Sequence, residues 1–283
     1  MTDSRRVAVV GAGPAGRAAA RELVTAGAAV TIYDREPQSG GLMRYGYPSF
    51  RMPDAISIRE AEQLKQLGVT LKLRQELGKD VTLEQLLDGY EAVLLAIGSP
   101  VARRLGIPGE NLPRVYTALE YLHASREDSP LTTGETVLVI GGGDTAIDAA
   151  TTAVALGATD VTIAYRGPEA GLKAQPHEIT YATERGVHFE CNRTPAMFQE
   201  NAKRLKTVFQ EGGELLADAV IIAIGQDRNS AFLASLGLIV RQDGSTDNPR
   251  VFVAGDTRYG SNRLAAAILD GRRAAKQILG LLE

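Results

Sequence analysis

Apolar and polar positions define a strand, a helix and a second strand near the start of the chain. Val7–Val10 is a continuous apolar run, as expected of a parallel strand that is covered on both faces. A glycine-rich turn, an alanine-rich helix that stops at Gly27 and an apolar strand over residues 29–33 follow. The same order returns over Val137–Arg166, where the helix stops at Gly157. The pattern predicts an α/β protein that contains two such units.

The segments between and after these units predict the other elements. Further helices are expected over 54–67, 82–87, 116–124 and 264–282. Strands are expected over 69–73, 92–97 and 251–254, with an antiparallel meander over 196–199, 205–209 and 215–224. Helix caps are expected at Asp54, at Thr82 with Gln85, and at Ser261 or Asn262. Residues 40–53 and 100–113 are rich in glycine and proline and predict a loop and a linker.

The first glycine turn, GAGPAG, has the spacing of a dinucleotide-binding fingerprint. Gly11 permits the tight turn, Gly13 lets the backbone approach a pyrophosphate, and Gly16 lets the helix pack close to the strand. Pro14 suits the first turn of that helix. Asp34 ends the second strand 18 positions after Gly16 (34 − 16), where an acid hydrogen-bonds the ribose hydroxyls. The ordered set predicts dinucleotide binding, whereas GxGxxG alone would also fit a structural turn.

The second glycine turn differs from the first in the residue that ends its second strand. Its fingerprint is GxGxxA, formed by Gly141, Gly143 and Ala146. Tyr165 stands where the first unit has Asp34, and Arg166 follows it. An acid repels a 2′-phosphate and an arginine attracts one, so the first turn is predicted to favour an unphosphorylated ribose and the second to favour NADP. The alternative is that Arg166 is a solvated charge.

Composition narrows the class of protein and its partners. A chain of 283 residues can bury one large core or two of ordinary size, and 23% charged and 44% hydrophobic residues are typical of globular proteins. The net charge of −3 gives no reason to expect nucleic acid or an anionic membrane as a partner. The sequence has no transmembrane run and no signal-peptide pattern, so the cytoplasm is the expected location.

Cys191 is the only cysteine, which excludes several redox centres within these residues. One thiol cannot form an intrachain disulfide, a CxxC pair or a cysteine-ligated iron–sulfur cluster. We expect Cys191 to be a small buried residue in a strand. His123, His177 and His188 show no ligand spacing, so no metal site is predicted.

Three further features are candidates for ligand contact. Arg44 and Arg51 are cations in the loop over 40–53 that could meet phosphates, although this loop also fits a structural turn. The strand ends AIGS and AIGQ are alike, and Gly98 in the first offers backbone without a side chain. The N–H groups at the start of the last helix, near Leu264, could face a ligand that gains negative charge.

Together these motifs resemble the two-dinucleotide flavoprotein reductases, and among them the glutamate synthase small-subunit group. This group includes ferredoxin-linked NADPH oxidoreductases and the flavin portion of dihydropyrimidine dehydrogenase. The resemblance covers nearly the whole length and rests on GAGPAG, GGLMRYGYPSFRMP, the AIGS and AIGQ pair, LGIPGENLP, GGGDTAIDAA, AYR and VFVAGDTRYGSNRLAAAILDGRRAA. Thioredoxin and glutathione reductases share the glycine turns but carry a redox cysteine pair that this chain lacks.

The resemblance implies two Rossmann-like dinucleotide-binding domains, each with a small antiparallel β-meander. Residues 1–108 and 228–283 would form an FAD-binding domain, and residues 109–227 an inserted NAD(P)H-binding domain. The residues implied to bind FAD are Gly11, Gly13, Pro14, Ala15, Gly16, Asp34, Arg35, Gly41, Leu42, Arg51, Leu77, Ala96, Gly98, Gly255, Asp256, Leu264 and Ala265. Those implied to bind NADPH are Gly141, Gly142, Gly143, Asp144, Thr145, Ala146, Tyr165, Arg166 and Gly225.

Some of these residues have roles that the resemblance implies. Gly41, Leu42 and Arg51 would line the phosphate and flavin side of FAD. Leu77 would meet the adenine through its backbone, and Asp256 would hydrogen-bond the ribityl or pyrophosphate region.

The sequence departs from the family pattern in three places. Gly167 follows Arg166 where members often have a second arginine, which leaves NADPH versus NADH open. The acid often found early in the last helix is replaced within residues 264–266. The cysteine-rich N-terminal region that carries iron–sulfur clusters in the glutamate synthase subunit is missing, so electrons are expected to leave by another route.

The predicted function is a flavoprotein reductase that passes hydride from NADPH to FAD and electrons to a separate acceptor. Such a transfer needs stacked rings and charge stabilisation, so no catalytic side chain is assigned. Linkers near Pro108 and Gln226–Asn229 would permit domain rotation. A ferredoxin-like protein, a synthase-like partner subunit, a quinone-like molecule and dioxygen all fit as acceptors. The alternative function is a redox-sensing or scaffold subunit with little turnover. The sequence does not predict the oligomeric state.

Overall fold

The computed structural model describes residues 5–127, 131–260 and 263–282. The chain divides into two compact units, each described by itself below. The first unit comprises the residues up to Arg44, Met52–Val101 and the residues from Gln226. The second unit comprises Tyr45–Arg51 and Ala102–Gly225. The middle of the chain is therefore an insertion into the first unit.

A five-stranded parallel sheet of order β15-β4-β1-β2-β3 forms the centre of the first unit. Its strands are β1 (Arg6–Val10), β2 (Ala29–Asp34), β3 (Thr70–Leu73), β4 (Ala92–Leu95) and β15 (Val251–Val253). Successive side chains of a strand point to opposite faces, so in β1 Val7 and Val9 join one apolar core while Ala8 and Val10 join another.

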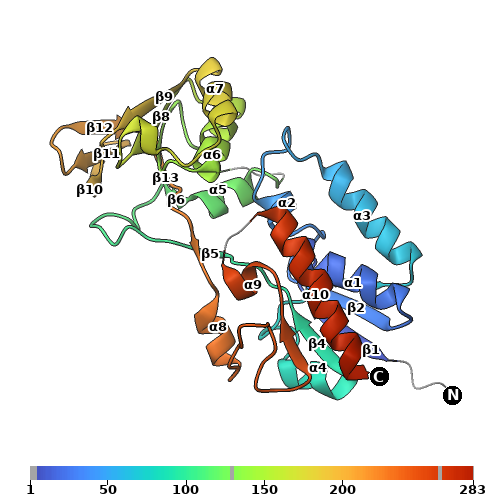
Figure 1. Cartoon of the computed structure of the whole chain (residues 1–283). Helices are drawn as coiled ribbons and strands as arrows, with labels where there is room; N and C mark the ends of the chain where they lie inside the picture. The colour runs from blue at the N-terminus through green and yellow to red at the C-terminus, as the bar shows by residue number, and fades with distance from the viewer. Residues whose placement is uncertain (1–4, 128–130, 261–262, 283) are drawn as a thin grey trace. The chain divides into compact units, whose positions relative to one another are not determined.

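Helices cover both faces of this sheet. One face carries α1 (Pro14–Thr25), α3 (Asp54–Gln66) and α10 (Leu264–Leu282). Helix α10 runs beside α1 (Figure 1). The other face carries α4 (Leu83–Gly89) and α8 (Ser230–Ser235). The short helices α2 (Leu42–Tyr45) and α9 (Asp256–Tyr259) follow β2 and β15.

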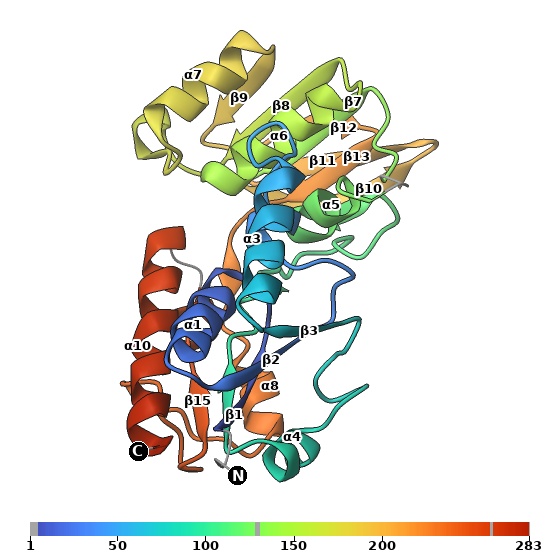
Figure 2. The same ribbon diagram turned by 90° about the vertical axis from the view of Figure 1, so that its right-hand side faces the viewer.

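The second unit has a parallel sheet with the equivalent order, β6-β13-β7-β8-β9. Its strands are β6 (Val115–Thr117), β7 (Thr136–Ile140), β8 (Asp160–Tyr165), β9 (Val187–Cys191) and β13 (Ala219–Ile222). Helices α5 (Ala118–Ala124), α6 (Asp144–Ala155) and α7 (Pro176–Glu184) pack on one face, and the short helix η1 is Glu169–Gly171. The antiparallel strands β10 (Pro195–Asn201), β11 (Arg204–Phe209) and β12 (Glu214–Ala217) pack on the other (Figure 2).

Residues 102–112 belong to the second unit because they pack on this antiparallel sheet. Phe198 N donates to Pro108 O at 2.9 Å. A Cβ on Gly109 would lie 1.9 Å from Phe198 O, so the two backbones are in close contact. Leu105 and Ile107 join the same apolar cluster as Phe198. Where the chain enters and leaves the second unit, β5 (Val101–Ala102) and β14 (Gln226–Asp227) pair as a two-stranded sheet.

The structure corrects the predicted third strand of the meander, residues 215–224. This segment forms two strands, β12 and β13, that are separated at Asp218. The Asp218 carboxylate accepts hydrogen bonds from Glu135 N and Thr136 N, and Asp218 N donates to Thr136 O at 2.8 Å. These bonds turn the chain out of the antiparallel sheet and into the parallel one. In the described part of the first unit, the structure has isolated antiparallel bridges, Val240–Thr246 and Ser245–Phe252, where the resemblance implies a meander.

Helix starts were predicted with mixed success. The capping box of Thr82 and Gln85 is present. Asp54 is the first residue of α3 and Pro53 is the N-cap; the Asp54 carboxylate accepts from Arg44 Nη2 at 2.8 Å. The helix predicted from residue 116 begins at Ala118, since its first two residues pair with β13. The caps expected at Ser261 and Asn262 lie outside the described residues.

Candidate functional site

The predicted residues of the first unit meet at one edge of its sheet. In the register of the parallel strands, Val10 of β1 lies beside Tyr33 of β2 and Leu95 of β4, and Leu95 lies beside Val253 of β15. The segments that follow these strand ends are therefore neighbours. They carry Gly11–Gly16, Asp34, Ala96–Gly98 and Gly255–Asp256. The chain reverses its direction of winding between β1 and β4, and this is the edge at which open α/β sheets bind ligands.

Two of the three glycines in the first turn are required by packing within the protein, because a neighbouring backbone carbonyl occupies the space of a Cβ. A Cβ on Gly11 (φ 108°) would lie 2.2 Å from Ala96 O, and one on Gly16 would lie 1.9 Å from Gly11 O. A Cβ on Gly13 would meet nothing nearer than 3.8 Å, at Gly41 Cα. Internal packing therefore does not demand glycine at 13, but a phosphate group that approaches the backbone would. The cradle at Gly13 fits a pyrophosphate.

Asp34 is held at the end of β2 by backbone donors and is 8% exposed. Its Oδ2 accepts from Ala12 N at 2.5 Å, and its Oδ1 accepts from Glu36 N at 2.8 Å. Burial raises the pKa of Asp34, and the two backbone N–H groups oppose this shift. An ionised carboxylate has about four acceptor sites, so the two bonds leave capacity for ribose hydroxyls.

Hydrogen bonds fix the two segments beside the first turn. Gly98 N donates to the hydroxyl of Thr257 at 2.7 Å, which ties the AIGS end to α9. Gly255 has φ 69° and ψ −148°, a conformation open to glycine, and its N–H donates to Asp270 of α10 at 2.8 Å. A Cβ on Gly255 would lie 2.7 Å from Ala15 Cβ. Gly255 therefore touches the helix that begins at the first glycine turn.

The second unit also has a glycine turn at one edge of its sheet, and there the ring of Tyr165 lies beside the turn. Ile140 of β7 lies beside Ala164 of β8 and Ile222 of β13, so the turn from Gly141, the end of β8 and Gly225 share one edge. A Cβ on Gly143 would have no neighbour within 4 Å, whereas one on Gly142 would lie 2.4 Å from the ring of Tyr165. The site therefore has an open backbone cradle at Gly143 and an aromatic wall.

Tyr165 and the segment after it enclose the second glycine turn. The Tyr165 hydroxyl donates to Gly171 O at 2.6 Å, and Lys173 N donates to Gly142 O at 2.8 Å. Asp144 Oδ1 accepts from Gln175 N at 3.0 Å, so this carboxylate is engaged in holding the same segment. Arg166 is exposed at the end of β8, where a ligand phosphate can reach it.

Arg51 lies in the second unit, where its guanidinium is bonded to two carboxylates. Arg51 Nη1 donates to Asp148 of α6, and Nη2 donates to Glu178 of α7 at 2.8 Å. Burial raises the pKa of Asp148 to about 7, and Arg51 opposes that shift. Nearby, Tyr45 stacks on His123 with ring centroids 4.6 Å apart. These contacts explain why 45–51 belongs to this unit; the expectation that Arg51 lines FAD stays a prediction.

The other predicted residues have varied surroundings. Leu77 is buried, and Gln75, two residues before it, donates its N–H to Asp34 O at 2.8 Å. Arg35 is exposed and pairs with Glu36. Arg44 is buried. Leu264 and Ala265 are exposed in the first turn of α10, and Leu42 begins α2. Cys191 ends β9 but is half-buried, which corrects the expectation of a buried thiol.

Sequence reasoning missed Thr257, Asp270 and the segment 171–175. Thr257 and Asp270 accept hydrogen bonds from the backbone N–H groups of Gly98 and Gly255. The segment 171–175 encloses Tyr165, a residue that the sequence did predict. A signal for Asp270 was present, since it occupies the apolar stripe of its helix with Ala274 and Ile278. In the described ranges there is no group of three potential metal ligands. The same ranges contain no helix with the length and apolarity needed to cross a membrane.

Comparison with known proteins gives one family and several relatives. The family described as pyridine nucleotide-disulphide oxidoreductase matches residues 5–271. The small chain of glutamate synthase [NADPH] from Escherichia coli is 35% identical over 99% of this chain and 69% of its own length. The NAD-dependent dihydropyrimidine dehydrogenase subunit PreT from Escherichia coli is 35% identical over 98% of this chain and 68% of its own. The chain spans 49% of AegA from the same organism, to which it is 36% identical.

Solved structures show the same fold. A variant of FprA from Mycobacterium tuberculosis superposes with a TM-score of 0.81 at 18% identity, over 99% of this chain and 85% of that one. Thioredoxin reductase from Lactococcus lactis superposes with a TM-score of 0.77 at 23% identity, over 99% of both chains. The predicted fold class, α/β with two Rossmann-like units, is confirmed.

Proposed function

Because the chain belongs to the pyridine nucleotide-disulphide oxidoreductase family, we propose that it is a flavoprotein reductase with FAD in the first unit and NADPH in the second. Electrons leave to a separate acceptor, a ferredoxin-like protein or a partner subunit. The observation that carries the proposal is the difference at the second strand of each unit. Asp34 ends it in the first unit, and Tyr165 with Arg166 ends it in the second.

The first site suits FAD because its polar groups match an unphosphorylated adenosine and a pyrophosphate. Gly13 leaves room for a phosphate at the start of α1, where free N–H groups and the helix dipole favour negative charge. Asp34 retains acceptor capacity for ribose hydroxyls. A 2′-phosphate beside this buried carboxylate would be repelled.

The second site suits a nucleotide with more negative charge. Gly143 leaves the start of α6 open in the same way as Gly13 does in α1. Arg166 is exposed at the end of β8 and can pair bidentately with a phosphate. The relatives support both pyridine nucleotides, since one is a glutamate synthase [NADPH] chain and another an NAD-dependent dehydrogenase subunit.

Bound FAD would supply the hydride-accepting ring system of the reaction. The chain's own groups bind and orient: the two glycine turns hold pyrophosphates, and Asp34 fixes a ribose. The first turn of α10 presents N–H groups whose positive dipole stabilises negative charge. No side-chain nucleophile is required. The names of the relatives, a small chain and a subunit, favour an acceptor on another polypeptide.

Anaerobic titration tests the proposal. The purified protein, reconstituted with FAD, should lose its absorbance near ~450 nm, the flavin band, when NADPH is added. NADH should act at a higher concentration. If FAD binds and neither nucleotide bleaches it, the chain is not a reductase. The redox-sensing alternative is favoured instead if NADPH bleaches FAD but no ferredoxin, quinone or dioxygen reoxidises it at an appreciable rate.

A further inference from the structure

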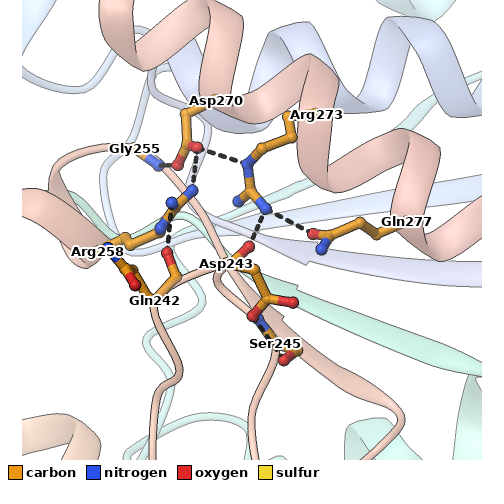
Figure 3. A network of polar contacts seen from close by, with 8 residues as sticks. All are labelled: Gln242, Asp243, Ser245, Gly255, Arg258, Asp270, Arg273 and Gln277. Atoms are coloured by element: carbon orange, nitrogen blue, oxygen red, sulfur yellow. Dashed lines mark hydrogen bonds and ion pairs between the residues drawn. The ribbon is translucent and has the colours of Figure 1, made fainter.

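Asp270 is a buried carboxylate in the middle of α10, on the stripe of that helix that packs against the core. It is 6% exposed and accepts three hydrogen bonds (Figure 3). Its Oδ2 accepts from Gly255 N at 2.8 Å, and its Oδ1 accepts from Arg258 Nη1 and from Arg273 Nε at 2.7 Å. Burying a carboxylate is costly unless it is paired and hydrogen-bonded, and here two guanidinium groups and one backbone N–H meet that cost.

The two arginines extend the cluster to a neighbouring turn. Arg258 Nη2 donates to Gln242 O at 2.5 Å, and Arg273 Nη1 donates to Asp243 O (Figure 3). Arg273 Nη1 also donates to Gln277 one turn further along α10, at 2.7 Å. The cluster therefore connects α9, α10 and the turn at 242–243 through charged hydrogen bonds, which are stronger than neutral ones.

Ala15 of the first glycine turn is a point at which both the Gly255 segment and α10 touch α1. A Cβ on Gly255 would lie 2.7 Å from Ala15 Cβ, and a Cβ on Gly271 would lie 2.1 Å from Ala15 O. Gly271 is the residue after Asp270. The start of α1, the Gly255–Asp256 turn and the middle of α10 are thus in van der Waals contact, although they are far apart in the sequence.

Asp270 controls the backbone of the residue before Asp256. Gly255 has a conformation that other residues rarely adopt, and its N–H is fixed by the carboxylate of Asp270. If that bond is lost, the Gly255–Asp256 turn can rotate while the first glycine turn, held by Gly11 and Gly16, stays in place. The bond therefore restrains the backbone at the start of the Gly255–Asp256 turn.

We propose that Asp270 is a positioning residue that acts through Gly255 to hold Asp256 in place for the ribityl part of FAD. The inference rests on the proposed function, because it requires FAD in the first unit. Asp270 itself need not touch the cofactor. Arg258 and Arg273 hold its carboxylate in this orientation through hydrogen bonds to Oδ1.

The test compares FAD with ADP, which lacks the ribityl and flavin part. In Asp270→Asn, the dissociation constant of FAD from the apoprotein should rise by about tenfold or more, as expected when a charged hydrogen bond is lost. The constant with which ADP displaces FAD should change by less than about twofold, because ADP relies on the first glycine turn and Asp34. The visible circular dichroism of bound FAD should also change.

Arg272→Gln is the matched control. Arg272 lies in the same helix but is half-exposed and pairs with Glu22 on the surface at 3.4 Å, so this variant should bind FAD and ADP as the wild type does. If the dissociation constants of FAD and ADP rise by the same factor in Asp270→Asn, the residue is merely structural and the inference is wrong. Unchanged FAD affinity also overturns it. A wild-type protein that binds no FAD would instead overturn the proposed function.

A milder variant covers the case in which Asp270→Asn does not fold. Arg258→Met keeps the bond between Asp270 and Gly255 but removes one of the guanidinium groups that hold Asp270. The dissociation constant of FAD should rise by about threefold and that of ADP should stay unchanged, since the Asp270 carboxylate loses one of its three hydrogen-bond partners. Equal FAD binding in Arg258→Met and the wild type would count against the proposal.

Discussion

The two glycine turns share their internal packing and differ in what faces their ligand. Gly11 and Gly141 both have positive φ, and a Cβ on either would lie 2.2 or 2.3 Å from the carbonyl of Ala96 or Ala223. In the first unit the next residue donates its N–H to Asp34. In the second the next residue packs on the ring of Tyr165, which has no acceptor for a ribose in that place.

This comparison separates two kinds of sequence requirement. The glycine after each first strand is demanded by the fold, because a neighbouring backbone occupies the space of its Cβ. The residues at the end of the second strand are not fixed by such a backbone contact, so they can differ between the units, and under the proposed function they select the nucleotide. Substitutions of the first kind should therefore change stability, and those of the second kind should change specificity.

The largest effect is expected at the third position of the fingerprint, which is Gly16 in one unit and Ala146 in the other. In Gly16→Ala the new Cβ would lie 1.9 Å from Gly11 O, so the free energy of unfolding should fall by about 3 kcal/mol through overpacking. In Ala146→Gly the fall should be about 1 kcal/mol, the cost of glycine in a helix. Urea unfolding of the apoprotein measures both.

FAD binding gives an independent readout of the same pair. Gly16→Ala should also lower the affinity for FAD. Ala146→Gly should leave that affinity unchanged, because Ala146 lies in the second unit. If Gly16→Ala left the free energy of unfolding unchanged, the carbonyl of Gly11 would not crowd this position, contrary to the structure.

Local spacing explains which of these features could be predicted from the sequence. The strands, the glycine turns and Asp34 lie within single βαβ units, so periodicity and spacing define them. The break at Asp218 could not be predicted, because it depends on hydrogen bonds to residues 135 and 136 that are distant in the sequence. Helix α7 was missed, and the ionic partners of Arg51 on α6 and α7 also depend on tertiary contacts.

The helices that follow the two turns each carry a buried charge, and the signs are opposite. Arg17 of α1 pairs with Glu60 of α3 at 2.7 Å, and burial lowers the pKa of Arg17. Asp148 of α6 pairs with Arg51, and burial raises its pKa to about 7. Arginine stays charged despite such a shift, whereas a carboxyl with a pKa near 7 titrates under ordinary conditions. Only the second of these charges should make stability depend on pH near neutrality.

The raised pKa of Asp148 should make the free energy of unfolding fall as the pH rises. The folded state keeps the proton between the unfolded pKa of 3.8 and the folded pKa of about 7. The stabilisation is therefore complete below the lower value and is lost as the pH rises to the upper one, with a slope of about 1.4 kcal/mol per pH unit. In Asp148→Asn this slope should disappear between pH 5 and 6.5, measured by urea unfolding at each pH.

Arg51→Met sharpens the same test. Removal of the cation leaves burial unopposed, so the pKa of Asp148 should rise further and the loss of stability should extend to higher pH. A wild-type slope that Asp148→Asn leaves intact would assign the pH dependence to other groups.

The smallest effect is expected at Arg166, where the two units differ without any demand from packing. Arg166→Gln should raise the KM for NADPH by about tenfold and that for NADH by less than about twofold, because the arginine pairs with the 2′-phosphate that NADH lacks. Arg185→Gln is the control: Arg185 is a cation of the same unit whose guanidinium lies over the ring of Tyr181, 3.5 Å from its centroid. If the two variants raise both KM values alike, Arg166 contributes only general positive charge, and the difference between the strand ends does not select the nucleotide.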